Sequence, residues 1–294
     1  MPLKPSRRSR EFVVHNKKRG ILRKKFYAAA ALAAVAVAAF SVPTASATDV
    51  QTNIIGGHAA TGDTSWMVSL QYDAPKFNRA DWHTCGGTLV FRSWVVTAAH
   101  CVTDPPGGSA IPTADKQFKV RVGSKQRNSG GETATVTQVV VPAGWDWNLA
   151  SNDLAMLKLD HALTMQPLPL AAEAARPGTP VTLYGWGMSE PDSAGTATET
   201  LQQLETTVTK SNRCDDSGIA WDEICLHNPN GTDGACYGDS GGPAVQRVHG
   251  VLRLVGAASR GGSQYCGITS EVYTGLPNYR TFIYDTARGV SAPN

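Results

Sequence analysis

The stretch GACYGDSGGPA (residues 234–244) decides which fold this chain can have. It places Ser240 in the pattern G-x-S-x-G, which is typical of a nucleophilic serine held on a tight turn. The pattern occurs in folds where strands alternate with long helices and in folds made of strands alone. The choice therefore depends on the strand pattern and on where the histidine and the acid that activate such a serine lie along the chain.

From residue 54 onward the chain consists of short apolar or alternating runs separated by Gly, Pro, Asn and Asp, which predicts an all-β sandwich or barrel. Only PNYRTFIYDTA (277–287) suggests a helix, with Pro277 at its start. The proline-rich segment 163–180 divides the expected strands into two nearly equal sets, so we expect two β domains joined by a linker. The expected strands cover residues 66–72, 87–91, 118–122, 133–141, 153–159, 181–185, 204–209, 252–259 and 271–275.

The first 53 residues have the pattern of a targeting segment. A basic run (residues 17–25) precedes the apolar run 26–40, and Ala45–Ala47 offers a cleavage site of small residues. The apolar run is shorter than the ~20 residues that a membrane span needs. We therefore predict a signal peptide at 1–47, a secreted extracellular protein, and a mature form that is not membrane-bound. Arg7-Arg8 leaves twin-arginine export as an alternative to the general route.

The net positive charge of the whole chain comes from this segment. It holds 10 of the 27 Lys and Arg residues and 2 of the 24 acidic residues, so the remainder carries 17 basic and 22 acidic residues, a net charge of −5. A net acidic mature protein gives no reason to expect nucleic acid as a partner.

All six cysteines follow the signal segment. An even number in an exported chain favours disulfides, and no C-x-x-C or H-x-x-x-H spacing suggests a metal site. The pattern alone leaves the pairing open. We expect neither a metal nor a cofactor.

The histidine and the acid lie before the serine. His100 is in TAAHC (97–101) and Asp153 is in NDLAMLKL (152–159). In α/β-hydrolases the serine precedes both partners, whereas here the only histidine after Ser240 is His249. The order His, Asp, Ser and the lack of alternating helices argue against that fold and against an unrelated serine esterase.

Six motifs in this order and spacing resemble the chymotrypsin/trypsin-like serine peptidases. The resemblance covers residues 54–287 and implies two packed six-stranded antiparallel β-barrels, about 54–165 and 180–276, with a C-terminal helix at about 277–287. It implies a secreted serine endopeptidase domain at 54–294, acting on protein or peptide substrates through an acyl-enzyme, and a monomer. The motifs are IIGG (54–57), CGGTLV (85–90), TAAHC, NDLAMLKL, YGWG (184–187) and GDSGGP (238–243).

The resemblance also implies catalytic roles. A serine hydroxyl is too weakly acidic to attack an amide unaided, so it needs a base such as imidazole, with an ordinary pKa near ~6.5. His100 is the implied base, Asp153 the acid that orients it, and Ser259 a serine that hydrogen-bonds this acid. The backbone N–H groups of Gly238 and Ser240 are the implied oxyanion hole. A non-catalytic homologue that acts as a binding module remains the alternative to an active enzyme.

Activation by cleavage before Ile54 is a further implication. The freed α-ammonium of Ile54 would pair with Asp239, and residues 48–53 would be an activation propeptide. Asn53 departs from the usual Arg or Lys before the cut, so we expect a separate activating protease. His83 matches a histidine that holds the acid in some zymogens of this family, although a simply packed histidine is an equal alternative.

The specificity pocket is implied to lie between the segment Gly234–Tyr237 and the segment Ser259, Arg260 and Gly261. Gly234 stands where trypsins have an acid. Glu271 aligns with the back wall, where some relatives that cleave after both aromatic and basic residues have glutamate. We therefore predict mixed aromatic and basic preference, with a neutral chymotrypsin-like pocket, or a shifted Asp233, as alternatives.

Family pairing implies three disulfides and no calcium loop. The loop 123–132 contains a single acid, Glu132, so we expect no metal there. The implied pairs are Cys85–Cys101, Cys214–Cys225 and Cys236–Cys266.

Overall fold

The computed structural model describes residues 54–74, 79–105, 108–111, 116–191 and 197–290. The expected signal peptide (1–47) and propeptide (48–53) lie outside these residues. No helix within the described part of the chain is long and apolar enough to cross a membrane.

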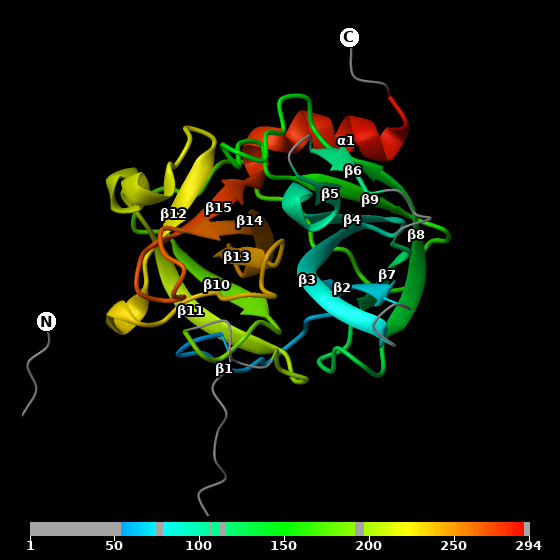
Figure 1. Cartoon of the computed structure of the whole chain (residues 1–294), viewed down its shortest axis with the longest axis horizontal. Helices are drawn as coiled ribbons and strands as arrows, with labels where there is room; N and C mark the ends of the chain where they lie inside the picture. The colour runs from blue at the N-terminus through cyan, green and yellow to red at the C-terminus, as the bar shows by residue number, and fades with distance from the viewer. Residues whose placement is uncertain (1–53, 75–78, 106–107, 112–115, 192–196, 291–294) are drawn as a thin grey trace, which may run out of the picture. The chain divides into compact units, whose positions relative to one another are not determined.

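Six antiparallel strands close the first barrel in the order β2-β3-β4-β9-β8-β7 (Figure 1). On β7 (Phe118–Val122), Phe118, Val120 and Val122 are buried and alternate with more exposed Lys119 and Arg121, as a half-buried strand requires. The other strands are β2 (Met67–Ala74), β3 (Arg79–Phe91), β4 (Trp94–Thr97), β8 (Glu132–Val140) and β9 (Ala155–Leu159).

The second barrel has the strand order β11-β10-β13-β14-β15-β12 and closes through pairing of β11 with β12. Both expected barrels, and with them the all-β fold class, are confirmed. The strands are β10 (Pro180–Gly185), β11 (Gln202–Thr209), β12 (Glu223–Leu226), β13 (Pro243–Val248), β14 (Val251–Gly261) and β15 (Glu271–Gly275). Shorter elements are β5 (Thr103–Asp104), β6 (Ser109–Ala110), and the 3-10 turns η2 (Ala99–Cys101), η3 (Ser211–Ser217) and η4 (Pro229–Gly231).

The first described residues join the second barrel and not the first, where the sequence placed them. β1 (His58–Ala59) pairs with β11, and the Ile54 side chain is fully buried in the core of the second barrel with Val181 and Leu183. Two residues are too few to show a periodic pattern, so this pairing was not predictable from the sequence.

The C-terminal helix begins later than expected. Pro277 lies in a 3-10 turn, η5 (Leu276–Tyr279), and the α-helix α1 covers Arg280–Arg288. Tyr284 of α1 packs edge-on against Phe91 of the first barrel, with 5.4 Å between ring centroids. The helix therefore leaves the second barrel and packs against the first.

Candidate active site

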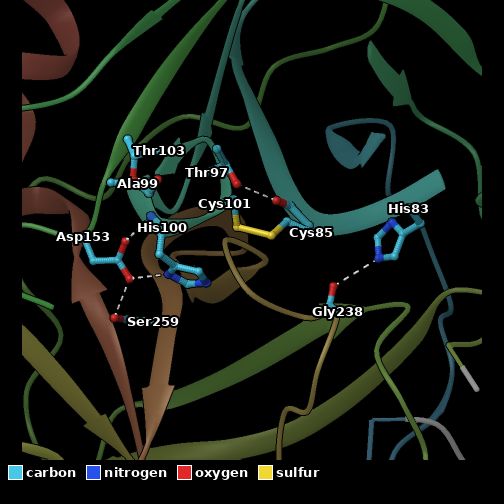
Figure 2. The surroundings of a disulfide bond; sticks show 11 residues. His83, Cys85, Thr97, Ala99, His100, Cys101, Thr103, Asp153, Gly238 and Ser259 are labelled. Carbon is cyan, nitrogen blue, oxygen red and sulfur yellow. Dashed lines mark hydrogen bonds and ion pairs between the residues drawn. A yellow bond between two sulfur atoms is a disulfide. The ribbon is translucent and has the colours of Figure 1, made fainter. Parts of the chain in front are cut away.

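His100 and Asp153 come from neighbouring strand ends of the first barrel. His100 lies in η2, directly after β4, and Asp153 lies just before β9, which pairs with β4. His100 Nδ1 is 2.7 Å from Asp153 Oδ2, and the backbone N–H of His100 donates to Asp153 Oδ1 at 3.0 Å (Figure 2). Because a carboxylate only accepts, Nδ1 carries the proton, which leaves Nε2 free to act as a base.

The Asp153 carboxylate is buried but well supplied with donors. Its side chain is 1% exposed, and Ser259 Oγ donates to Oδ2 at 2.7 Å. Burial acts to raise the pKa of Asp153, yet the His100 charge and these hydrogen bonds outweigh it, so the pKa is lowered. Burial likewise acts to lower the pKa of His100, and Asp153 outweighs it, so that pKa is raised.

Ser240 and His100 line one cavity of about 700 Å³. No hydrogen bond within 3.5 Å joins their side chains among the residues that the structure describes. In ligand-free enzymes this contact is often long and shortens when substrate binds. Trp147, which the sequence did not single out, also lines the cavity, with its ring centroid 6.3 Å from that of His100.

Two glycines beside Ser240 are required by close contact between the barrels. The N–H of Gly86 in β3 donates to the Ser240 carbonyl at 2.8 Å, and a Cβ on Gly86 would lie 2.8 Å from the Cα of Gly242. Gly241 has φ +73°, and its Cβ would lie 2.1 Å from Thr97 Oγ1. Side chains at these positions would clash with the facing barrel beside Ser240.

Gly238 has φ +98°, a conformation that favours glycine. Its carbonyl is 3.0 Å from His83 Nε2, which must therefore carry the proton, and His83 Nδ1 accepts from Ser69 Oγ at 2.8 Å. Burial lowers the pKa of His83 to about 4, so the ring stays neutral. In this structure the His83 ring hydrogen-bonds the Gly238 carbonyl and not the Asp239 carboxylate.

Asp239 is buried between two backbone donors. Gly187 donates to Oδ1 at 2.7 Å and Cys236 donates to Oδ2 at 2.9 Å. A Cβ on Gly185 would lie 1.9 Å from Oδ1, so the glycines of YGWG make room for the carboxylate. Burial raises the pKa of Asp239 to about 7, although the two hydrogen bonds lower it.

The segment after Ile54 pairs with the segment that leads to Ser240, one residue before the cavity lining begins at Ala235. Ile55 and Gly234 exchange two backbone hydrogen bonds, each 3.0 Å long. A Cβ on Gly56 would lie 2.1 Å from the Asp233 carboxyl carbon, so the first residues fit closely against the segment before the nucleophile.

Glu271 occupies the place that a side chain at Gly234 would fill. A Cβ on Gly234 would lie 2.4 Å from Glu271 Oε1, and Ala235 N–H donates to Oε2 at 3.0 Å. Glu271 is buried and lines the same cavity as Ser240. Burial raises the pKa of Glu271 to about 8. The Asp239 charge also raises this pKa, and the Ala235 hydrogen bond lowers it.

The other expected pocket residues divide into two groups. Tyr237, Ser259, Arg260 and Gly261 border the cavity, whereas the Asp233 carboxylate accepts from Asn230 Nδ2 at 2.7 Å and Thr232 Oγ1 at 3.0 Å and does not border it. Arg260 forms an ion pair with Glu223 of β12, a buried acid that the sequence analysis did not single out.

The three disulfides join Cys85 to Cys101, Cys214 to Cys225 and Cys236 to Cys266, the pairs that the resemblance implies. The first and third lie beside His100 and Ser240 and border the cavity, so they fix the segments that carry these side chains. The cluster of Cys85, Cys101 and His100 is no metal site, because its two sulfurs are bonded to each other.

Comparisons with known proteins agree with this geometry. The family model described as Trypsin matches residues 54–283. The chain is 30% identical over 259 residues to chymotrypsin-like elastase family member 1 of Macaca fascicularis, covering 81% of this chain and 91% of that protein. It is also 30% identical over 236 residues to trypsin-1 of Astacus astacus, covering 74% of this chain and 95% of that protein. With its two closed barrels, this chain belongs to the trypsin-like serine peptidase family.

Proposed function

We propose that this protein is a secreted serine endopeptidase with Ser240 as nucleophile, His100 as general base and Asp153 as the acid that orients it. The observation that carries the proposal is the hydrogen-bonded chain from Ser259 through Asp153 to His100, which ends in the cavity that Ser240 lines. A binding module needs neither this chain nor a free imidazole nitrogen beside a serine.

The geometry supports the following steps. His100 Nε2 takes the Ser240 proton as Oγ attacks the carbonyl carbon, and Asp153 stabilises the imidazolium. The N–H groups of Gly238 and Ser240 stabilise the oxyanion, at about 3 kcal/mol for each donor. His100 then gives the proton to the leaving amine, and water releases the acyl group by the same steps.

Pre-steady-state hydrolysis tests this proposal. We expect protein that starts at Ile54 to release a burst of product from an activated ester, equal to the enzyme concentration, because an acyl-enzyme accumulates. It should also cleave internal bonds of a denatured protein, which an esterase would not. Ester turnover without peptide cleavage would contradict the assignment as a peptidase.

We further propose that the specificity pocket accepts both aromatic and basic P1 residues. Gly234 has no side chain, and the Glu271 carboxyl group occupies the space that this leaves and lines the cavity. Its methylenes can contact a ring, and its carboxylate can pair with Lys or Arg.

At pH 9, where the Glu271 carboxylate is charged, replacing Glu271 with glutamine is expected to lower kcat/KM for Arg substrates by about tenfold or more, because a charge-assisted pair of ~1.5 to 3 kcal/mol is lost. Cleavage after Phe should be nearly unchanged. Matched peptides that differ only at P1 measure both effects. The control is Asp233→Asn; loss of Arg cleavage there, and not in Glu271→Gln, would show that the wrong acid was assigned.

The P1 preference is expected to change with pH. Because the pKa of Glu271 is raised to about 8, its carboxyl group is neutral at lower pH and becomes charged as pH rises through that value. The ratio of kcat/KM for Arg substrates to that for Phe substrates should therefore rise by roughly fivefold between pH 6.5 and 9. Because kcat/KM depends on the ionisation of the free enzyme, the midpoint of this rise gives the pKa of Glu271 without substrate. His100 protonation affects both substrates and cancels. In Glu271→Gln the ratio should be flat, and a flat ratio in the unmodified enzyme would rule out this role.

We also propose that the chain is a zymogen activated by another protease that cuts before Ile54. Asp239 is buried with two backbone donors, and a buried carboxylate without a counter-charge is costly. The close fit of residues 54–56 against Asp233 and Gly234, in the segment before the nucleophile, supports a docked N-terminus as the partner.

Secretion and a monomeric mature form complete the proposal. Three disulfides fit an oxidising compartment, and the pattern of residues 1–47 is that of a signal peptide. Membership of the family supports protein or peptide substrates, and the net acidic character after residue 53 gives no support to nucleic-acid binding.

A further inference from the structure

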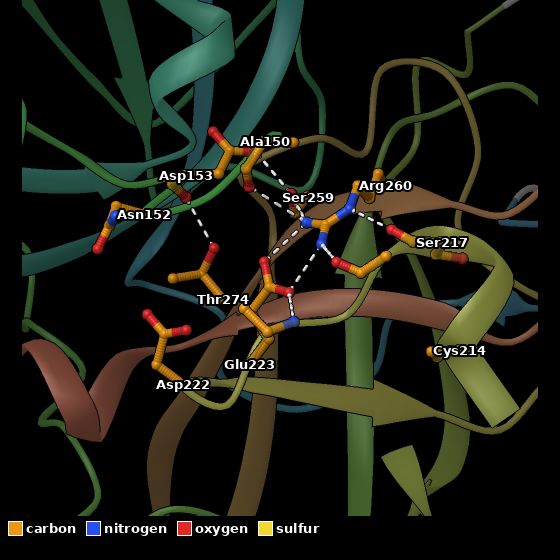
Figure 3. Close-up of polar contacts among 12 residues, drawn as sticks. Ala150, Asn152, Asp153, Cys214, Ser217, Asp222, Glu223, Ser259, Arg260 and Thr274 are labelled. Carbon is orange, nitrogen blue, oxygen red and sulfur yellow. Dashed lines mark hydrogen bonds and ion pairs between the residues drawn. The ribbon is translucent and has the colours of Figure 1, made fainter. Parts of the chain in front are cut away.

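The Arg260 guanidinium is surrounded by acceptors of the protein itself. It forms a bidentate ion pair with Glu223, with both N–O distances 2.7 Å, and the Glu223 side chain is 1% exposed (Figure 3). A guanidinium has N–H donors and no acceptor. The Glu223 carboxylate and the other acceptors named below occupy all of these donors, so none is left for an acidic substrate. The other contacts are with the carbonyl oxygens of Ser217 (2.8 Å), Gly218 (2.9 Å) and Ala150 (3.2 Å), and with Ser259 Oγ (3.1 Å).

The contact with Ser259 determines where the proton of that hydroxyl points. A serine hydroxyl has one proton, and Arg260 can only donate. Ser259 Oγ therefore accepts from Arg260 and gives its proton to Asp153 Oδ2. Without Arg260, this hydroxyl could rotate away from the carboxylate.

The contact with Ala150 holds the strained segment that leads into Asp153. Ala150 has φ +48° and Asn152 has φ +55°, conformations that non-glycine residues adopt only when their surroundings hold them. Arg260 donates to the Ala150 carbonyl, and Tyr279 Oη packs 2.9 Å from Asn152 Oδ1. Two different elements therefore fix the backbone just before the acid.

We propose that Arg260 is a positioning residue for the catalytic acid: it holds Asp153 against His100 through Ser259 and Ala150, and Glu223 balances its charge. The inference rests on the proposed function, because it assigns Asp153 and His100 their catalytic roles. It gives Arg260 a task distinct from contact with substrate.

Charged or titratable groups near Asp153 come from several elements. They are His100 from η2, Arg260 from β14, Glu223 from β12, Asp222 beside it, and Tyr279 from η5. Burial and the neighbouring carboxylates raise the pKa of Tyr279, so this group stays neutral during a titration of His100. The balance between Arg260 and Glu223 is therefore the feature to perturb.

The first test compares Glu223→Gln with the double variant Arg260→Gln/Glu223→Gln. NMR of the His100 ring, with Ser240→Ala present to prevent autolysis, gives its pKa. In Glu223→Gln the unbalanced guanidinium disfavours the imidazolium, so the pKa should fall by about 0.5 unit or more. In the double variant no charge remains, so the pKa should recover most of this fall, and the remainder reports the looser contact between Asp153 and His100.

Both variants lose the same carboxylate, so damage to the β12 region is common to them. Equal pKa shifts in the two would overturn the proposal, because the charge of Arg260 would then not act on His100. This measurement needs no turnover. Failure of the proposed function, seen as an inactive protein starting at Ile54, is therefore separate from failure of this inference.

The second test is Arg260→Lys, which keeps the charge but not the planar fork. One ammonium cannot reach Glu223, Ser259 and the Ala150 carbonyl together, so kcat should fall by about tenfold while KM changes little. The His100 pKa should fall by less than in Glu223→Gln, and the downfield Nδ1 proton signal of His100 should broaden, because the contact with Asp153 loosens. An unchanged kcat and an unchanged proton signal would overturn the positioning role.

Discussion

Replacing Ser240 with alanine is expected to lower kcat for peptide hydrolysis by roughly a million-fold, because the nucleophile that forms the acyl-enzyme is lost. His100→Ala should lose a similar amount, since Ser240 without a base is unreactive at neutral pH. Initial rates on a chromogenic peptide, with protein that starts at Ile54, measure both.

The two losses should not multiply. Ser240 and His100 act as a unit, so the double variant should be about as slow as either single one. A Ser240→Ala protein that keeps more than about a tenth of the activity would show that this serine is not the nucleophile, whatever the motif around it.

Protein that retains residues 48–53 is expected to hydrolyse peptides at least about 100-fold more slowly than protein that starts at Ile54. The free α-ammonium is needed as a partner for Asp239, and a buried carboxylate without a partner costs ~3 to 5 kcal/mol. The same peptide assay, before and after a protease removes the propeptide, measures the difference.

Asp239→Asn offers the matched control for this activation step. It keeps the shape of the side chain and removes the charge that would attract Ile54, so cleaved Asp239→Asn should be nearly as slow as the uncleaved chain. Equal turnover by the cleaved and uncleaved unmodified proteins would refute the zymogen proposal. The raised pKa of Asp239, about 7 in the uncleaved chain, should fall once the ammonium is beside it.

The strand pattern of the sequence predicted most of the two barrels but missed three strands. β7 and β15 have the residues that alternation and turn signals gave them. β4 (Trp94–Thr97) is a short and wholly buried run, without alternation. β13 begins with Pro243, and β12 begins with the charged Glu223, so both resemble loops until their tertiary partners are known.

The candidate site was predictable where short motifs carry it and unpredictable where distant residues meet. The sequence singled out His100, Asp153 and Ser259, which the structure joins by hydrogen bonds. The pair of Glu223 and Arg260 was missed, because 37 residues separate them and each alone resembles an exposed charge. The pair forms because β12 and β14 both pair with β15, one on each side of it.

Labelling with a fluorophosphonate tests the central claim most directly, because this reagent reacts with a serine only where a base and an oxyanion hole activate it. Mass spectrometry of protein that starts at Ile54 should find one adduct, on the peptide that contains Ser240. The adduct should be absent in Ser240→Ala and strongly reduced in His100→Ala. No adduct on the unmodified protein, or an adduct on another serine, would contradict the assignment of Ser240 as the nucleophile of this peptidase.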